Sequence, residues 1–382
     1  MRPEIMTRMN VDLNAIISNY HAVCCYASPA RVFAVVKSEA YGHGAVPVAR
    51  ALQSVGCHRF AVAMVDEGIQ LRRAEIAGEI MVMGAILPEQ MAIMAEHDLI
   101  PVLPDRERLE KWQETAKAQG KRLPYHIKVD VGLGRMGFMP EEGSSAVQAA
   151  ASLPDIELVG IGSHLSYPGG PLEVNERELA RYHTFTSGFG EQFPDIARHL
   201  AASQAVARFK DMHMDLVRVG GLLYGFQHVS DSGLKLRPAM EYKTVVAQVR
   251  HLPAGWHIGY DMACVLEEPT RIALLPLGWT DGLASTQLGK ARVLIRGEFC
   301  TLVGLCTDFA MIDVSHLPEV QTGDEVVLIG KQGNHSITAI ELGRAGGIST
   351  GQLLGKVSLR VPRIYSLKGQ ERDELSILRY LS

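Results

Sequence analysis

Short apolar runs alternate with helix-forming segments through the first 220 residues, and this alternation limits the possible folds more than any other feature. Segments such as 46–52, 67–77, 106–119 and 176–189 have the length and charge spacing of crossover helices. Eight strand-and-helix units in about 235 residues predict an α/β fold with an N-terminal (β/α)8 TIM barrel. The expected strands are 32–37, 58–63, 79–84, 99–103, 125–131, 158–164, 199–203 and 216–220.

The pattern changes after Pro238. Apolar runs then follow one another between glycines and prolines, without long helical segments, which predicts a mostly-β domain. We therefore expect two domains, a barrel over 1–239 and a C-terminal β domain over 240–382, and the length of 382 residues is sufficient for two cores. The expected C-terminal strands are 243–251, 271–277, 291–296, 300–305, 311–314 and 325–329.

Composition excludes several classes of partner. The net charge of -4 gives no basic surface for nucleic acid or an anionic membrane. Residues 1–10 contain no apolar signal region, and no run of about 18 apolar residues occurs, so we expect neither export nor membrane association. The six cysteines show no CxxC pair and no zinc-ligand spacing. We expect reduced thiols, no metal site and a cytoplasmic protein.

Lys37 ends the first apolar run and is followed at once by small, turn-forming residues. An amine held at the end of a buried strand is partly desolvated, which lowers its pKa and makes it a nucleophile or base near neutral pH. The alternative is a solvated lysine whose stem alone is buried.

The run Ala34-Val-Val-Lys37, with Ala40-Tyr41-Gly-His-Gly44 after it, resembles the signature of the alanine racemase family. The resemblance implies a barrel followed by a β domain, in agreement with the strand pattern. It also implies that Lys37 carries pyridoxal 5'-phosphate (PLP) and that Tyr41 contacts the cofactor phosphate. The expected activity is racemisation of a small neutral amino acid, alanine in the first place and serine as an alternative.

The last two expected barrel strands end in groups suited to an anion. Ser203 supplies a hydroxyl, and Gly220-Gly221-Leu222 can present backbone N–H groups, although a glycine pair also serves in ordinary turns. By resemblance these residues bind the cofactor phosphate, and Arg218 donates to the pyridine nitrogen. Because a guanidinium keeps its proton, that ring nitrogen stays unprotonated, which favours racemisation over decarboxylation or transamination.

The segment 128–138 contains Gly132-x-Gly134-x-x-Gly137, the spacing of a dinucleotide-binding loop. Because no helix begins directly on these glycines, we reject that interpretation. By resemblance, Arg135 binds near the cofactor's phenolic oxygen and the substrate carboxylate, and Lys128 is carbamylated to position Arg135. The alternative for Lys128 is a surface or salt-bridged lysine.

Racemisation requires a proton to leave one face of the α-carbon and another to arrive on the opposite face, so two acid/base groups are needed. Lys37 supplies one. Tyr260 resembles the family's catalytic tyrosine, and His164 matches the barrel histidine that bonds it. A free tyrosine titrates at about 10, so it needs such help to act as a base. In the family this tyrosine reaches the partner's barrel, which implies a homodimer with shared active sites.

Five positions in the C-terminal half differ from the family pattern. Thr307 is also a candidate substrate-binding residue, and these differences bear on the preferred amino acid more than on the chemistry. Two alternatives remain, a non-catalytic PLP carrier and a PLP-dependent decarboxylase of the same fold. The five positions are Trp279 and Cys264 in place of tyrosines, Leu305 and Thr307 in place of an arginine and a methionine, and Leu359 in place of a phosphate-binding tyrosine.

Overall fold

The computed structural model of the chain describes residues 6–190, 192–226, 229, 232–262, 264–368 and 370–375. The chain divides into two compact units. The first, called here the barrel unit, comprises 16–40 and 48–237. The second, called here the β unit, comprises 1–15, 41–47 and 238–382. Two short stretches from the first fifty residues therefore belong to the β unit.

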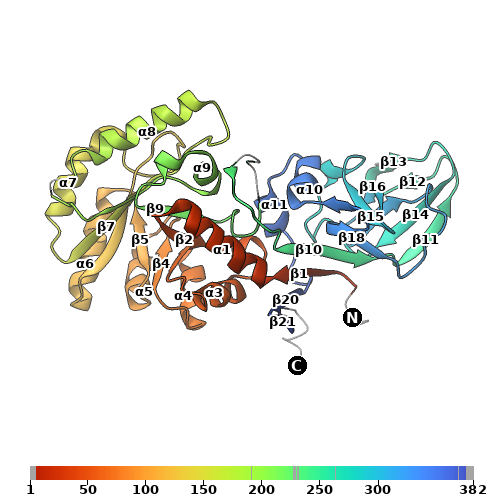
Figure 1. The fold of residues 1–382 in the computed structure, drawn as a ribbon, viewed down its shortest axis with the longest axis horizontal. Helices are drawn as coiled ribbons and strands as arrows, with labels where there is room; N and C mark the ends of the chain where they lie inside the picture. The colour runs from red at the N-terminus through yellow and green to blue at the C-terminus, as the bar shows by residue number, and fades with distance from the viewer. Residues whose placement is uncertain are drawn as a thin grey trace. The chain divides into compact units, whose positions relative to one another are not determined.

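The barrel unit contains a sheet of eight parallel strands, with helices outside the strands (Figure 1). The strand order is β8-β7-β6-β5-β4-β3-β2-β9. Ala202 and Arg218 form a parallel bridge, and the Arg218 amide donates to the Ala201 carbonyl at 3.1 Å, which links the two edges of the sheet. The predicted barrel is confirmed. Its strands are β2 (Arg31–Val35), β3 (Arg59–Val62), β4 (Glu79–Val82), β5 (Ile100–Leu103), β6 (Leu123–Lys128), β7 (Ile156–Gly162), β8 (Ala197–His199) and β9 (Leu216–Val219).

The helices of the barrel follow local sequence signals. Helix α6 (Arg106–Gln119) begins where the Asp105 side chain accepts the Arg108 N–H, and it ends at Gly120, whose φ of 62° is left-handed. Its bounds are those predicted from the sequence. The other helices are α1 (Leu13–Ala27), α3 (Ala45–Gln53), α4 (Val65–Arg73), α5 (Met91–Glu96), α7 (Gly143–Ala151), α8 (Leu172–Thr186) and α9 (Ser203–Arg208).

The β unit is built on one sheet in the order β11-β14-β17-β16-β15-β18-β10-β1-β20-β21, with β19 paired to β18. Strand β1 pairs antiparallel with β10 and parallel with β20, so the start of the chain lies inside this sheet. The predicted mostly-β architecture is confirmed. The strands are β1 (Arg8–Asp12), β10 (Met240–Val245), β11 (Gln248–Leu252), β14 (Thr270–Leu275), β15 (Arg292–Ile295), β16 (Glu298–Leu305), β17 (Ala310–Asp313), β18 (Glu325–Gln332), β19 (His335–Ile337), β20 (Arg363–Leu367) and β21 (Gln370–Leu375).

Smaller elements complete the β unit. The run 243–251, expected as one strand, is divided between β10 and β11. The Val246 amide donates to the Asp324 carbonyl just before β18, whereas the next amide, that of Ala247, donates to the Leu274 carbonyl on β14. Two short strands, β12 (His257–Ile258) and β13 (Cys264–Val265), form a separate hairpin. Helices α10 (Ala339–Ala345) and α11 (Thr350–Gly355) follow β19. No helix among the described residues is long and apolar enough to cross a membrane.

Candidate active site

Lys37 lies two residues beyond β2, at the start of a left-handed turn labelled α2 (Lys37–Tyr41). Ser38, Glu39, Ala40 and Tyr41 all have φ between 52° and 54°. This conformation costs an L-residue about 1–2 kcal/mol, and such strain is concentrated at functional sites. Burial, followed by the charge of Arg135, lowers the pKa of the Lys37 amine. The turn therefore presents a partly desolvated amine.

Glu67, at the start of α4, secures this turn. Its Oε1 accepts the Ser38 amide at 2.5 Å, and its Oε2 accepts the amides of Ala63 and Met64 at 2.8 and 3.0 Å. One carboxylate thus joins the residue after Lys37 to the end of the next barrel strand. The sequence analysis missed Glu67 as a site residue. The local sequence indicates only that it lies at N3 of a helix.

Arg218 on β9 is 6% exposed, and its guanidinium is held on two sides. Nη1 donates to the His199 carbonyl at 2.9 Å and to His199 Nδ1, and Nη2 donates to the Leu200 carbonyl at 3.1 Å and to the Ser163 carbonyl. Its Nε–H has no hydrogen-bond partner among the described residues. Burial lowers the pKa of Arg218 to about 10, so the side chain stays charged at neutral pH. One directed donor therefore remains for a ligand.

Two buried histidines, His199 and His126, form a hydrogen-bonded chain that begins at Arg218. His199 Nε2 and His126 Nδ1 lie 2.9 Å apart. Because His199 Nδ1 accepts from Arg218, its Nε2 carries the proton and donates to His126. Burial and the charge of Arg218 lower the pKa of both rings, that of His126 to about 3, so both are neutral.

Two glycines of β7 make room for this pair. A Cβ on Gly160 would lie 2.3 Å from His126 Nδ1, and one on Gly162 would lie 2.2 Å from His199 Cε1. The sequence analysis missed both histidines as site residues, although alternate glycines in a buried strand signal close approach by a neighbour.

Ser203, the first residue of α9, lies beside the loop after β9. Its Oγ accepts the amide of Gly220 at 3.0 Å and that of Leu222 at 3.4 Å. A hydroxyl and converging backbone N–H groups are the donors that bind phosphate in barrels. The structure therefore brings together the predicted phosphate-binding residues Ser203, Gly220 and Leu222, with Gly221 between the last two.

Lys128 ends β6 and is 8% exposed, with its Nζ donating to the Val129 carbonyl at 3.0 Å. It is therefore not a surface lysine, and among the described residues it forms no salt bridge. Burial, and then the charges of Arg218 and Arg135, lower its pKa to about 7.

Arg135 lies at the end of a loop that Asp130 organises. Asp130 Oδ1 accepts the amides of Gly132 and Gly134 at 2.9 and 3.1 Å, and Oδ2 accepts the Arg135 amide at 2.7 Å. The glycines that resemble a dinucleotide motif thus form a loop around a carboxylate, and the next helical turn begins only at Pro140.

His164 shows that these groups gather in one place. Burial is the largest cause that lowers its pKa to about 3, followed by the charges of Arg218, Lys128, Arg135 and Lys37. The charges of four side chains therefore act on one neutral imidazole near the carboxyl ends of the barrel strands. This region attracts anionic groups such as phosphates and carboxylates.

The remaining predicted residues belong to the β unit. Tyr260 begins a helical turn between β12 and β13, and its ring centroid lies 5.7 Å from that of Trp279. Thr307 follows β16, and its carbonyl accepts the Thr280 hydroxyl at 3.0 Å. Tyr41 lies beside Gly351, whose Cβ position would be 3.5 Å from Tyr41 Cδ1.

The other family differences vary in exposure. Leu305 is buried at the end of β16, Cys264 is half-buried in β13, and Leu359 is 57% exposed. All six cysteines are free. No group of three or more metal-ligating side chains occurs in the part of the chain that the structure describes.

Sequence comparison extends over both units. A family model described as "Alanine racemase, N-terminal domain" matches residues 11–228, and one described as "Alanine racemase, C-terminal domain" matches 239–365. The chain belongs to the alanine racemase family. Membership identifies it as a PLP-dependent amino-acid racemase.

Individual racemases resemble this chain along nearly its whole length. The alanine racemase of Carboxydothermus hydrogenoformans is 36% identical over 365 residues, covering 93% of this chain and 98% of that protein. That of Symbiobacterium thermophilum is 36% identical over 374 residues, covering 96% and 97%.

Solved racemase structures share the fold. The Bacillus anthracis alanine racemase with bound L-Ala-P has a TM-score of 0.89 at 29% identity, and the match covers 100% of both chains. The Bartonella henselae alanine racemase with covalently bound pyridoxal phosphate has a TM-score of 0.84 at 26% identity, covering 94% of this chain and 99% of that one.

The donor set of this racemase fits PLP. The cofactor needs an amine for its aldehyde, donors for its phosphate and a partner for its ring nitrogen. The barrel unit offers the Lys37 amine, the Ser203 hydroxyl, whose oxygen is held by the Gly220 and Leu222 amides, and the Nε–H of Arg218. The fit therefore requires no change in the barrel residues.

Proposed function

We propose that this chain interconverts the L and D forms of alanine, with serine as the next substrate to test, by a two-base reaction of Lys37 and Tyr260. The observation that carries the proposal is the gathering of Lys37, Lys128, Arg135 and Arg218 around His164, with the Lys37 amine partly desolvated. The names of the relatives, alanine racemases matched over nearly their whole length, support alanine as the substrate.

Each barrel group has a place in holding the cofactor. Lys37 would bind PLP through its amine, and Arg218 would donate Nε–H to the ring nitrogen without giving up the proton. Ser203 and the segment Gly220-Gly221-Leu222 would bind the phosphate, with the Tyr41 hydroxyl as a further donor. When bound, PLP withdraws electrons from the α-carbon and so makes its proton acidic.

The two bases then move protons at opposite faces of the α-carbon. The Lys37 Nζ takes the proton from one enantiomer, and the Tyr260 Oη takes it from the other. His164, neutral because its pKa is lowered to about 3, can accept a hydrogen bond from the tyrosine. We further propose that Tyr260 acts on the barrel of a second copy, in a homodimer with shared active sites.

Arg135 would bind the substrate carboxylate, and Thr307 would contact the substrate side chain. Lys128 is suited to carbamylation, because with a pKa of about 7 a large share of its Nζ is the free amine at neutral pH. Addition of the amine to carbon dioxide gives a carbamate and releases one proton. This change converts the neutral amine into an anion beside Arg135.

The proposed setting is the cytoplasm, without nucleic-acid or membrane partners. The six free cysteines and the absence of a basic surface in the composition support it.

Proton NMR in D2O tests the proposed reaction. The PLP-loaded protein is incubated with L-alanine or L-serine while loss of the α-proton is followed and the product is analysed for chirality. We expect α-proton exchange together with the D-enantiomer, faster for alanine. Bound PLP without exchange would favour the carrier, and carbon dioxide release would favour the decarboxylase.

A further inference from the structure

The ring of Trp279 lies beside the ring of Tyr260. The two rings are tilted by 40° with centroids 5.7 Å apart. Tyr260 is 58% exposed, and its hydroxyl has no hydrogen-bond partner among the described residues. A tyrosine so exposed needs a neighbour that fixes its ring if its hydroxyl is to meet a substrate at a defined angle.

The loop that carries Trp279 packs tightly on the loop after β16. The Trp279 amide donates to the Cys306 carbonyl at 3.1 Å. A Cβ on Gly278 would lie 2.2 Å from the Thr307 carbonyl oxygen, so glycine is needed for this close approach. The position of Trp279 is therefore coupled to the position of the loop that contains Thr307.

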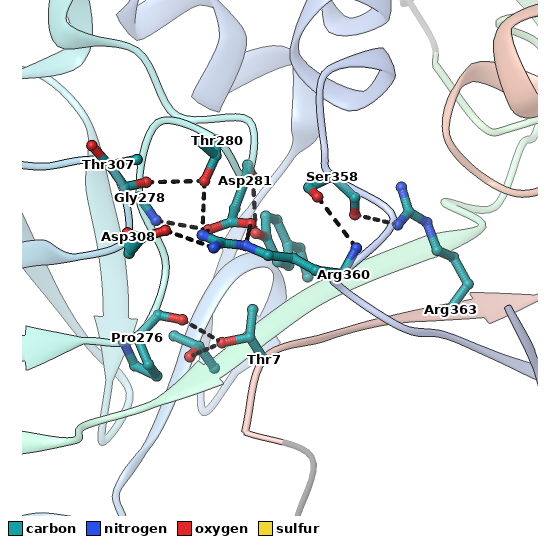
Figure 2. A network of polar contacts seen from close by, with 12 residues as sticks. Thr7, Pro276, Gly278, Thr280, Asp281, Thr307, Asp308, Ser358, Arg360 and Arg363 are labelled. Carbon is teal, nitrogen blue, oxygen red and sulfur yellow. Dashed lines mark hydrogen bonds and ion pairs between the residues drawn. The ribbon is translucent and has the colours of Figure 1, made fainter. Parts of the chain in front are cut away.

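Arg360 fastens these two loops together (Figure 2). Its Nε and Nη2 donate to the two carboxylate oxygens of Asp281 at 2.7 and 2.6 Å, and its Nη1 donates to Asp308 at 2.6 Å. Nη2 also donates to the Thr280 hydroxyl at 2.7 Å. Asp281 is 1% exposed, and its Oδ2 accepts the Gly278 amide at 2.9 Å. Thr280, after Trp279, is thus bound to the guanidinium directly, and Gly278, before it, is bound through the Asp281 carboxylate.

We propose that Trp279 is a positioning residue for Tyr260, and that Arg360, through Asp281 and Thr280, holds Trp279 against it. This inference rests on the proposed function, in which the Tyr260 hydroxyl is one of the two bases. Trp279 stands where the family pattern has a tyrosine. Its indole packs against the Tyr260 ring, and this packing orients that ring. Loss of one such aromatic pair corresponds to about a three- to tenfold change in an equilibrium or rate.

The first test measures the position of the rings without measuring activity. The PLP-loaded full chain is prepared with ring-labelled tyrosine, and the Tyr260 signals are assigned with Tyr260→Phe. The indole ring current should shift these signals away from ordinary tyrosine values. We expect Trp279→Leu to abolish the shift, Trp279→Phe to keep part of it, and Arg360→Gln to reduce it.

Arg296→Gln is the matched control, because Arg296 also forms a two-contact pair with one carboxylate, Asp324, at 2.7 and 3.1 Å. It should leave the Tyr260 shift unchanged. If Arg360→Gln does not fold, Thr280→Val replaces it, because that smaller change removes the hydrogen bond between Arg360 and the Thr280 hydroxyl. Unchanged Tyr260 signals in both Trp279→Leu and whichever support variant folds would overturn the proposal.

The second test uses α-deuterated substrate in both directions. Since the two bases act on opposite faces, Tyr260 removes the proton of one enantiomer and Lys37 that of the other. Trp279→Leu should slow the Tyr260 step about three- to tenfold. The deuterium isotope effect should then rise for one enantiomer and fall for the other.

Equal losses of kcat in both directions with unchanged isotope effects would contradict a positioning role. A wild-type protein without any racemase activity would instead contradict the proposed function, so the two failures are distinguishable.

Discussion

Asp130 provides the most quantitative test of how the barrel positions Arg135. Its carboxylate accepts the backbone N–H groups of Gly132, Gly134 and Arg135 at 2.7 to 3.1 Å. In Asp130→Asn one oxygen becomes an NH2 group, so at least one of these donors loses its acceptor. A hydrogen bond to a charged group contributes about 1.5–3 kcal/mol, and we expect the free energy of unfolding to fall by about that amount.

The same loss should weaken substrate binding, because Arg135 leaves its proposed place at the carboxylate. About 1.5–3 kcal/mol corresponds to a KM for alanine that is about ten- to 150-fold higher, while PLP affinity changes little. The assay combines urea unfolding with steady-state racemisation. The matched control is Asp215→Asn, whose carboxylate accepts the Arg198 amide at 2.7 Å near the amino ends of the strands. It should reduce stability and leave KM unchanged.

The pH dependence supplies an internal check. Burial opposes ionisation of Asp130, but the three backbone N–H groups and Lys128 outweigh it and lower the pKa of the carboxyl. Its contribution is therefore present above the ordinary aspartate pKa of about 3.9 and is lost as pH falls through the lower folded value. The stability difference between wild type and Asp130→Asn should shrink in that range. An Asp130→Asn protein with wild-type stability and wild-type KM would refute the reasoning.

Three further predictions concern the phosphate site and the histidine pair. Ser203→Ala removes the acceptor of two backbone amides and a donor to phosphate, so the Kd for PLP, measured by absorbance titration, should rise about tenfold; an unchanged Kd would contradict this role. Gly162→Ala places a Cβ 2.2 Å from His199 Cε1 and should lower the free energy of unfolding by about 1–3 kcal/mol, whereas Gly188→Ala, with its nearest atom at 3.6 Å, should not. The pKa of His126 is lowered from 6.5 to about 3 in the folded protein, so the free energy of unfolding should fall as pH drops below 6.5. In urea unfolding, His126→Asn should make this free energy depend less steeply on pH. An equal dependence in wild type and variant would contradict the prediction.

The barrel could be predicted from the sequence because its strands are short apolar runs, and several of them are followed by charged segments of helix length, such as 67–77, 106–119 and 176–189. Helix α6 was predicted with its observed bounds from its length and charge spacing, and in the structure the Asp105 side chain caps its start and Gly120 ends it. The sequence placed Lys37 at the end of its strand, whereas Lys128 and Arg218 fell inside the expected strands 125–131 and 216–220 and were assigned by resemblance. In the structure, burial and the charges of all three lower the pKa of His164.

Other features depend on contacts distant in sequence. Strand β1 pairs with β10 across more than 200 residues, and no local pattern in 8–12 specifies that partner. Ser38, Glu39 and Ala40 adopt the left-handed φ values that glycine normally supplies. Because none of the three is a glycine, the sequence does not predict this turn. The His126–His199 pair and the Arg360 contacts likewise arise only when separate strands or loops meet.

Deuterium incorporation by Tyr260→Phe tests the two-base account most directly. The PLP-loaded variant is incubated in D2O with each enantiomer of alanine in turn, and both α-deuterium content and chirality are measured. We predict that racemisation is lost, while the enantiomer served by Lys37 still exchanges its α-proton with retention of configuration. Racemisation at the wild-type rate in this variant would contradict the account.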